Sequence, residues 1–347
     1  MYTNYWIVDK NVDNLENLPQ LKVAADLLCH NEVIAFPTET VYGLGGNAKS
    51  DEAVEKIFAA KGRPSDNPLI VHIAEKKQLD DFVDNIPKKA EMLMKHFWPG
   101  PLTIILSYKE GTLSKKTTAG LMTVGIRMPD HPVALALLKQ TGLPIAAPSA
   151  NRSGKPSPTL ASHVQEDLDG RIAGIVDGGP TGVGLESTVL DCTTEIPVIL
   201  RPGGVTKEQL EAVVGEVLFD PALTNALEAP KAPGMKYRHY APNAPLYLVD
   251  GTKEQIQALI NNRKKEGLTV GLLTTVENQS FYSADSIFTC GQREQLETVA
   301  SSIYEALRSF DKENVDVIYS EMFPDTGVGN AIMNRLLKAA GQKVIKA

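Results

Sequence analysis

Short apolar runs separated by helical patterns fill the first two thirds of the chain and predict an α/β or α+β domain with a mixed sheet. Apolar residues recur at helical spacing from 18 to 30, and a brief buried strand at 33–36 follows, where Pro37 ends it. The other apolar runs of strand character lie at 69–73, 102–106, 124–128, 145–147, 172–176, 187–191 and 198–200. The other helical patterns lie at 51–60, 87–97, 132–140 and 207–214.

A second pattern begins near residue 245 and predicts a smaller, Rossmann-like doubly wound domain with a parallel sheet. Its expected strands are 246–249, 269–274, 286–289 and 315–320, and its expected helices are 253–265, 292–310 and 331–340. Between the two patterns, prolines punctuate a stretch with little apolar periodicity, which is typical of a linker. The sequence therefore predicts a first domain at 1–218, a linker at 219–244 and a C-terminal domain at 245–347.

Composition and charge narrow the class of protein. The chain has 347 residues, of which 43% are hydrophobic and 22% are charged, and this length favours two domains. Its net charge of −7 provides no general basic field for nucleic acid, so an anion site has to be local. The three cysteines are far apart and indicate reduced thiols rather than a disulfide framework or a structural zinc. Without a signal peptide pattern or an apolar run of about 20 residues, a soluble cytoplasmic protein is expected.

Three polar segments follow predicted strands or helices and carry most of the candidate chemistry. They lie at 37–45, 61–68 and 148–154, and each combines glycine or proline with hydroxyls, amides or cations. An ordinary turn needs glycine or proline but seldom has Lys, Arg, Ser and Asn together. Fixed cations, hydroxyl donors and accessible backbone N–H groups suit an anionic ligand. Three such loops in one chain favour a site for a polyanion.

Lys61 and Arg63 also have a structural interpretation. They could form a solvated charge pair at a helix end, where the helix dipole favours cations. Pro64 and Pro68, however, stiffen the loop, and rigid cations are better phosphate ligands than mobile ones. As exposed loop cations, the two residues are expected to add little to stability.

The other candidate residues have comparable alternatives. Arg127 ends a predicted strand, either as a charge that guards a sheet edge or as a clamp for a carboxylate. His72 lies inside an apolar run, where a core histidine is the ordinary interpretation. Ser187 and Arg201 adjoin glycine-containing turns that could be plain loops. The chain has no P-loop, no zinc-hydrolase motif and no Gly-x-Ser-x-Gly motif.

Several motifs together resemble the YrdC-like family. They are PTETVYGL at 37–44, KGRP at 61–64, NPL at 67–69, PSAN at 148–151, LESTV at 185–189 and LRPG at 200–203. The linker sequence APGMKYRHYAP at 232–242 is similar to the signature of the family's long form, the threonylcarbamoyl-AMP synthases with an additional C-terminal domain. The resemblance covers essentially the whole chain and implies a YrdC-like open twisted mixed sheet around a concave site.

The resemblance also implies an activity. Enzymes of this family condense L-threonine, bicarbonate or CO2, and ATP into L-threonylcarbamoyl-AMP and release pyrophosphate. The product is the donor for N6-threonylcarbamoyladenosine at position 37 of tRNA. Expected partners are therefore downstream tRNA threonylcarbamoyl transfer proteins and tRNA itself, and no membrane. Mg²⁺ is expected to accompany ATP, bound through phosphate oxygens and waters rather than by dedicated metal ligands of the chain.

The same resemblance assigns roles to individual residues. The threonine-side residues are Thr40, His72, Arg127, Ala147 and Ser187, with Arg127 on the carboxylate of threonine and the backbone of Ala147 near the amino acid. The nucleotide-side residues are Arg63, Asn67, Thr123, Ser149, Asn151, Ser157, Arg201 and Tyr240. Lys61 and Arg63 are expected to hold phosphates and to be catalytic. The linker at 219–244 is expected to act as a lid that excludes water from the adenylate.

Two other interpretations of the sequence remain. One is a carbamoyl-transfer module like that of the hydrogenase maturation protein, which shares the YrdC-like core. That protein also carries an acylphosphatase-like region and Cys-x-x-Cys zinc motifs, and the three isolated cysteines argue against it. The other is a YrdC-like module that binds RNA without catalysis. The net charge of −7 and the lack of an aromatic–basic pattern weaken that alternative.

Overall fold

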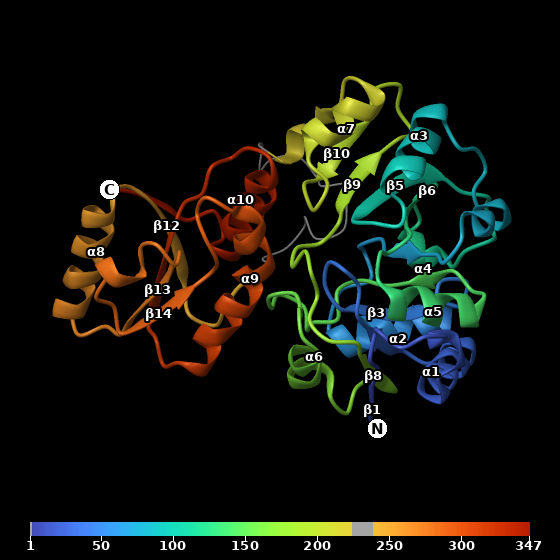
Figure 1. The fold of residues 1–347 in the computed structure, drawn as a ribbon, viewed down its shortest axis with the longest axis horizontal. Helices are drawn as coiled ribbons and strands as arrows, with labels where there is room; N and C mark the ends of the chain where they lie inside the picture. The colour runs from blue at the N-terminus through green and yellow to red at the C-terminus, as the bar shows by residue number, and fades with distance from the viewer. Residues whose placement is uncertain (1, 224–238) are drawn as a thin grey trace. The chain divides into compact units, whose positions relative to one another are not determined.

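The computed structural model describes residues 2–223 and 239–347 (Figure 1). Contacts between residues divide the chain into two units, and each is described by itself. The first unit comprises 1–153, 158–182 and 186–236, and the second comprises 154–157, 183–185 and 237–347. Most of the predicted lid, from 224 to 238, lies outside the described residues.

A mixed sheet of eleven strands forms the first unit, as the apolar runs predict. From edge to edge the strands are β1 (Asn4–Ile7), β8 (Gly174–Asp177), β2 (Ile34–Phe36), β3 (Gly43–Asn47), β7 (Ile145–Ala146), β4 (Ile70–His72), β6 (Thr123–Arg127), β5 (Leu102–Ser107), β9 (Thr188–Asp191), β10 (Val198–Arg201) and β11 (Leu218–Phe219). Strands β4 and β6 are parallel, whereas β5 and β6 are antiparallel. The prediction of a mixed α/β fold is confirmed.

Helices pack on this sheet and end at recognisable signals. They are α1 (Pro19–Cys29), α2 (Asp51–Lys61), α3 (Lys88–Phe97), α4 (Lys115–Thr118), α5 (Pro132–Thr141), α6 (Ala161–Leu168) and α7 (Lys207–Val214), with 3₁₀ turns at Leu15–Asn17, Lys76–Asp81 and Pro221–Leu223. Helix α2 begins where the Ser50 side chain accepts a hydrogen bond from the N–H of Ala53, and it ends at Gly62, which has a φ of 63°. This stop fixes where the loop with Arg63 begins.

Strand β3 is a correction to the sequence analysis, which predicts only a polar loop in this region. Its sequence, GLGGN, has one apolar side chain and therefore no alternating pattern. A Cβ atom at Gly45 would lie 2.7 Å from the ring of Phe36 and 2.9 Å from Ile145. Glycine therefore allows β3 to fit tightly between β2 and β7. The amphipathic edge strand β1 is likewise absent from the prediction.

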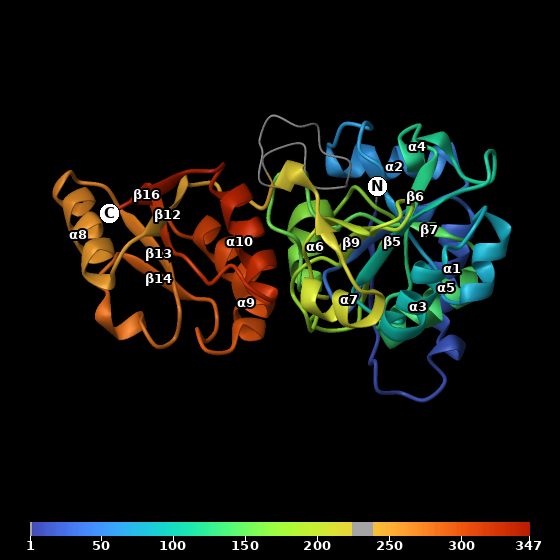
Figure 2. The same cartoon turned by 90° about the horizontal axis from the view of Figure 1, so that it is seen from above.

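The second unit contains a parallel sheet covered on both faces. Its strands are β12 (Leu246–Asp250), β13 (Val270–Thr274), β14 (Ser286–Thr289), β15 (Val317–Glu321) and β16 (Val344–Lys346), in the order β14-β13-β15-β12-β16. Helix α8 (Lys253–Lys265) lies on one face, and α9 (Leu296–Ser309) and α10 (Val328–Ala339) lie on the other (Figure 2). Two 3₁₀ turns, Gln279–Phe281 and Phe310–Lys312, complete the unit. The predicted doubly wound parallel architecture is confirmed.

Two details of this unit differ from the sequence prediction. Helix α9 begins at Leu296 rather than at 292, because Gln292 and Gln295 form a short bridge ahead of it. Gly291, with a φ of 89°, turns the chain there, and the N–H of Gln292 donates to the Thr298 hydroxyl at 2.8 Å. Strand β16 was not predicted at all, since its three residues are partly or fully exposed. Among the helices of the described ranges, none is long and apolar enough to cross a membrane.

Candidate active site

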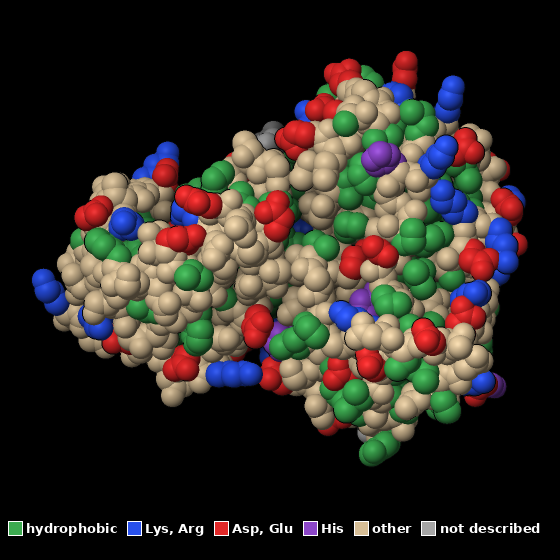
Figure 3. Space-filling view, viewed as in Figure 1, with side chains coloured by type: hydrophobic (Ala, Val, Ile, Leu, Met, Phe, Trp, Pro, Cys, Tyr) green, Lys and Arg blue, Asp and Glu red, His purple; other side chains and the backbone are tan. Residues whose placement is uncertain are grey.

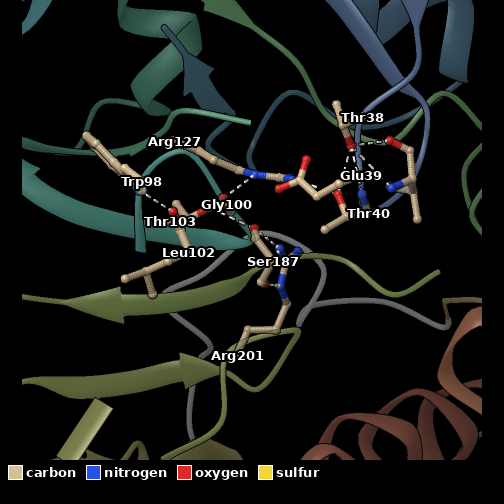
Figure 4. Close-up of polar contacts among 11 residues, drawn as sticks. Thr38, Glu39, Thr40, Trp98, Gly100, Leu102, Thr103, Arg127, Ser187 and Arg201 are labelled. Atoms are coloured by element: carbon tan, nitrogen blue, oxygen red, sulfur yellow. Dashed lines mark hydrogen bonds and ion pairs between the residues drawn. The ribbon is translucent and has the colours of Figure 1, made fainter. Parts of the chain in front are cut away.

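Arg127 is the central charged residue of the first unit. It ends β6, pairs in register with His72 of β4, and is only 4% exposed. Its Nη1 donates to the Thr40 hydroxyl at 2.8 Å, and its Nε donates to the carbonyl of Gly100 at 3.3 Å (Figure 4). Its Nη2 lies 2.5 Å from Oε1 of Glu39. The guanidinium is therefore held in one orientation, as a clamp for a carboxylate requires.

The loop after β2 presents Thr40 to this guanidinium. Thr38 organises the loop, because its hydroxyl accepts hydrogen bonds from the N–H groups of Thr40 and Val41 at 3.2 and 3.3 Å. The same hydroxyl donates to the carbonyl of Val41 at 2.7 Å. Both threonines are buried. These hydrogen bonds of Thr38 fix the turn, and the Thr40 side chain points toward Arg127.

Glu39 is a site residue that the sequence analysis did not assign. Its carboxylate forms an ion pair with Arg127, yet neither carboxylate oxygen has a hydrogen-bond partner among the described residues. Its side chain is 12% exposed. A carboxylate of the protein therefore lies on the guanidinium that the family resemblance assigns to the carboxylate of threonine. In the sequence, the position of Glu39 inside the motif at 37–44 could have identified it as a site residue.

His72 lies beside Arg127 as a neutral ring. It is 3% exposed, and its Nδ1 is 3.3 Å from the carbonyl oxygen of Ile70. Burial, together with the nearby positive charge of Arg127, lowers the pKa of His72 to about 3. An uncharged imidazole does not compete with Arg127 for an anion. Its role as a threonine ligand stays a prediction.

Ser187 and Arg201 form a second polar group. The Ser187 hydroxyl lies 2.7 Å from that of Thr103 and accepts a hydrogen bond from Nη2 of Arg201 at 3.2 Å (Figure 4). Arg201 also donates through Nε and Nη2 to the carbonyl of Ser187, at 3.2 and 2.9 Å. A predicted threonine-side residue and a predicted nucleotide-side residue are thus in direct contact. Thr103 was missed, although it is a hydroxyl residue within a mostly apolar strand.

Lys61 forms hydrogen bonds with the loop at 148–154. Its Nζ donates to the carbonyl of Asn151 at 2.7 Å and to the carbonyl of Ser149, and it lies 3.5 Å from Oδ1 of Asn151. The Ser149 hydroxyl donates to the same Oδ1 at 2.5 Å. The structure therefore brings three predicted nucleotide-side residues together. The expectation of an exposed loop cation is wrong for Lys61, which is the last residue of α2 and is 3% exposed.

The other predicted site residues of the first unit are Arg63, Asn67, Thr123 and Ala147. Arg63 is partly exposed after α2, and Thr123 opens β6. Asn67 is buried, with an amide nitrogen that has no partner in the described part of the chain. Ala147 follows β7, and its N–H donates to the carbonyl of Ile70 at 2.9 Å.

Ser157 and Tyr240 belong to the second unit. Ser157 is completely buried there. Tyr240 is 5% exposed, with its ring stacked on Tyr304 at 5.3 Å and beneath the guanidinium of Arg335 at 5.6 Å. The structure gives Tyr240 a packing role, and its assignment to ATP stays a prediction.

Buried histidines make the stability of the first unit depend on pH. Burial, followed by the charge of Lys10, lowers the pKa of His131 to about 4, although Glu39 acts in the opposite direction. The unfolded chain therefore binds more protons than the folded chain between the ordinary pKa of 6.5 and about 4. The free energy of unfolding should fall across this window as the pH falls, by up to about 1.4 kcal/mol per pH unit for each such histidine.

The substitution His131→Gln removes one of these groups. Urea unfolding at several pH values should show a shallower loss of stability below pH 6.5 in the variant than in the parent chain. Equal slopes for the two proteins would mean that His131 is not held neutral in the folded state.

The fold and the site together define a class of protein. A fixed guanidinium for a carboxylate lies in the same unit as a buried lysine and a cluster of hydroxyl, amide and cationic side chains. Such a site suits an enzyme that brings two anions together and activates one of them. A nucleotidyltransferase that activates a carboxylic or carbamic acid by joining it to a nucleotide has to hold two anions together in this way.

Comparisons with known proteins identify the family. Residues 26–203 match the Sua5/YciO/YrdC family model, described as "Telomere recombination", and 205–341 match "Threonylcarbamoyl-AMP synthase, C-terminal domain". The chain is 62% identical to the threonylcarbamoyl-AMP synthase of Bacillus subtilis, covering 100% of both chains. It is 48% identical to that of Pyrococcus abyssi, over 94% of this chain and 96% of the relative. The chain belongs to the threonylcarbamoyl-AMP synthase family.

A solved structure agrees with this assignment. The crystal structure of Pyrococcus abyssi Sua5 complexed with L-threonine matches with a TM-score of 0.93 at 47% identity, and it covers 99% of this chain and 100% of its own. The predicted family, fold class and enzymatic function are confirmed.

The two alternatives from the sequence are not favoured. A match of 205–341 to the C-terminal domain of the synthases is not expected of a carbamoyl-transfer module. On the face shown in Figure 3, acidic and basic side chains of the described residues are interspersed. An RNA-binding module without catalysis would be expected to gather its basic side chains.

Proposed function

We propose that this chain condenses L-threonine, bicarbonate or CO2, and ATP into L-threonylcarbamoyl-AMP and pyrophosphate, as the first step of tRNA N6-threonylcarbamoyladenosine formation. The observation that carries the proposal is the fixed guanidinium of Arg127, which a carboxylate of the protein already occupies. Pyrophosphate release that requires both threonine and bicarbonate is the expected experimental result.

The threonine side is proposed to centre on Arg127. The carboxylate of threonine would replace that of Glu39 and would accept from the guanidinium, with the Thr40 hydroxyl alongside. Neutral His72 would border the amino acid without repelling the guanidinium. Ser187 and the backbone at Ala147 are proposed as further contacts, in keeping with their buried positions.

The chemistry requires two anions to meet. The amine of threonine adds to CO2 and loses a proton, which gives a carbamate. A carbamate oxygen then attacks the α-phosphorus of ATP, the bond from that phosphorus to the bridging oxygen breaks, and pyrophosphate leaves with the electron pair. Positioning and neutralisation of charge supply most of the catalysis in such a transfer. Lys61 and Arg63 are proposed to supply that positive charge.

The nucleotide is proposed to lie along the loops at 61–68 and 148–154, which the hydrogen bonds of Lys61 hold together. Ser149 and Asn151 are fixed through Lys61, and Arg201 reaches Ser187 on the threonine side. Arg63, Asn67 and Thr123 are proposed to complete this side of the site, and the assignment of Ser157 to the nucleotide stays a prediction. The contact between Ser187 and Arg201 would set the α-phosphate next to the carbamate.

Mg²⁺ is proposed to arrive with ATP as part of the substrate. Among residues 2–223 and 239–347, no three His, Cys, Asp or Glu side chains are grouped so that they could hold a metal ion. Binding through phosphate oxygens and waters fits this arrangement, and the ion would neutralise phosphate charge. A titration of activity with Mg²⁺ at fixed ATP tests the requirement.

Glu39 is expected to compete with the substrate. The substitution Glu39→Gln removes the negative charge from Arg127 while it keeps the size of the side chain, so the threonine KM should fall or threonine should bind more tightly. Calorimetry with L-threonine, with Glu91→Gln on the exposed surface of α3 as the control, measures the effect. Weaker threonine binding in Glu39→Gln alone would instead make Glu39 a ligand of the substrate.

The linker is proposed to act as a lid over the nucleotide. A simple tether needs only Gly, Ser and Pro, whereas 236–240 carries aromatic and basic residues in succession. Because the ring of Tyr240 packs on Tyr304, the variant that isolates its hydroxyl is Tyr240→Phe. This variant should weaken ATP binding while the thermal midpoint stays nearly unchanged. Unaltered ATP binding in a folded Tyr240→Phe protein would leave the tyrosine a packing residue.

Transfer to tRNA is proposed to need separate proteins in the cytoplasm. The product is a mixed anhydride of a carbamate and a phosphate, which water destroys, so direct handover to a transfer protein would protect it. Modified tRNA should therefore form in higher yield when the transfer proteins are present during synthesis than when they are added later. Equal yields would argue against a direct handover.

A further inference from the structure

We propose that the second unit contains a separate binding site for a small zwitterion of the α-amino acid class. A cavity of about 460 Å³ lies at the carboxyl ends of the parallel strands β12 and β15, next to the start of α8. In open α/β sheets this edge is where ligands bind. The chemistry proposed for the first unit does not use the polar residues of this cavity.

Glu321 organises the floor of the cavity. It ends β15 and is 3% exposed. Its Oε1 accepts hydrogen bonds from Thr274 at 3.0 Å, Asn278 at 2.9 Å and Tyr282 at 2.7 Å. Its Oε2 accepts from Nη2 of Arg293 at 2.6 Å. Four donors hold the Glu321 carboxylate in one orientation, and Glu321 in turn positions the side chains that donate to it. We infer this positioning role rather than a stabilising one, because a buried ion pair is weak evidence for stability.

The contacts with Glu321 and its neighbours fix the guanidinium of Arg293 in a position to bind a ligand. Besides the contact with Glu321, its Nη1 donates to the carbonyl of Met322 at 3.1 Å, and its guanidinium lies 5.0 Å from the centre of the Phe323 ring. Its side chain is 36% exposed at the cavity. These contacts within the described residues use two of its five N–H donors. A fixed guanidinium with donors to spare matches the carboxylate of a ligand.

The cavity lining also carries negative charge. Asp250 ends β12, and Glu254 lies in the first turn of α8. With Glu321, the lining contains three carboxylates, and only Lys253 and Arg293 are basic. A phosphate ester with two negative charges would be repelled by this set. A zwitterion fits it, with the carboxylate on Arg293 and the ammonium group at Asp250 and Glu254.

The cavity lining also contains apolar side chains. Met322, which is partly exposed, and the buried Val249 and Ile256 are the apolar members of the cavity lining. Specific small-molecule sites combine apolar walls with a few polar groups in this way. The second unit would thus bind an amino acid at a site distinct from that of the substrate threonine, as an effector rather than a reactant.

Calorimetry on the full chain tests the proposal, with the proteinogenic L-amino acids, AMP and inorganic phosphate titrated one at a time. At least one amino acid should bind with an affinity that falls by about tenfold or more in both Arg293→Gln and Asp250→Asn. The matched control is Arg263→Gln, because Arg263 lies on α8 and pairs with Glu266 away from the cavity. Binding should be unchanged in that control.

The two variants keep the test decisive. Arg293→Gln leaves buried Glu321 without its charged partner and could impair folding, whereas Asp250 is exposed. Binding of an amino acid that Arg293→Gln weakens but that a folded Asp250→Asn protein leaves unchanged would overturn the proposal. The absence of any amino acid binding sensitive to Arg293 or Asp250 would overturn it too. Binding of AMP or phosphate without an amino acid would assign the cavity to a phosphate ligand and refute the proposed class.

Discussion

Replacing Lys61 with alanine is expected to lower turnover by about a hundredfold to a thousandfold, the usual cost of losing a preorganised charge at a reacting phosphate. Lys61 is buried and donates to the carbonyls of Ser149 and Asn151, so its ammonium group is fixed next to the proposed nucleotide. Steady-state assays of pyrophosphate release measure the effect. The control is Lys49→Ala, at an exposed lysine just before α2, the helix that ends at Lys61.

The same substitution is expected to cost stability. Removal of the amine leaves two buried carbonyl oxygens without this donor, which costs about 1–3 kcal/mol for a buried polar group. Turnover therefore has to be measured per folded protein, well below the thermal midpoint. A folded Lys61→Ala variant with normal turnover would contradict the catalytic assignment, and a stability loss alone would leave Lys61 as a structural residue.

Arg127→Lys is expected to raise the threonine KM by about tenfold to a hundredfold, since a charge-assisted hydrogen bond contributes about 1.5–3 kcal/mol. A lysine keeps the charge but loses the planar fork that holds Thr40 and a carboxylate at the same time. The KM for ATP should change far less. Arg171→Lys, at an exposed position of the same unit, is the matched control.

Calorimetry separates the two ligands in this variant. Threonine binding should weaken, and ATP binding should stay close to that of the parent chain. Loss of ATP binding together with intact threonine binding would place Arg127 on the nucleotide instead.

The sequence was sufficient to predict elements with strong periodicity and to locate the polar loops. Helix α2 and strands β12, β13, β14 and β15 of the second unit have apolar patterns and end signals, so local pattern determines them. Strand β3 lacks such a pattern because glycines replace side chains where Phe36 and Ile145 approach. Only the packed sheet reveals why that segment is extended.

The burial and the partners of several site residues could not be predicted from the sequence, because they depend on tertiary contacts. Lys61 follows a helical pattern as a charged end residue, and only the return of the loop at 148–154 shows that it is buried. Glu39 sits between two threonines in the sequence, but its pairing with Arg127 spans many residues and needs the fold. Thr103 resembles any strand residue until Ser187 is found beside it. Residue types predicted the chemistry, whereas partners required the structure.

Product analysis tests the central claim most directly. The purified chain is incubated with ATP, Mg²⁺, L-threonine and bicarbonate, and pyrophosphate release is measured alongside mass spectrometry of the nucleotide products. Release should require threonine and bicarbonate together, and the mass of threonylcarbamoyl-AMP should appear in step with the pyrophosphate. Equal pyrophosphate release without threonine, or release with no threonylcarbamoyl-adenylate formed, would contradict the account.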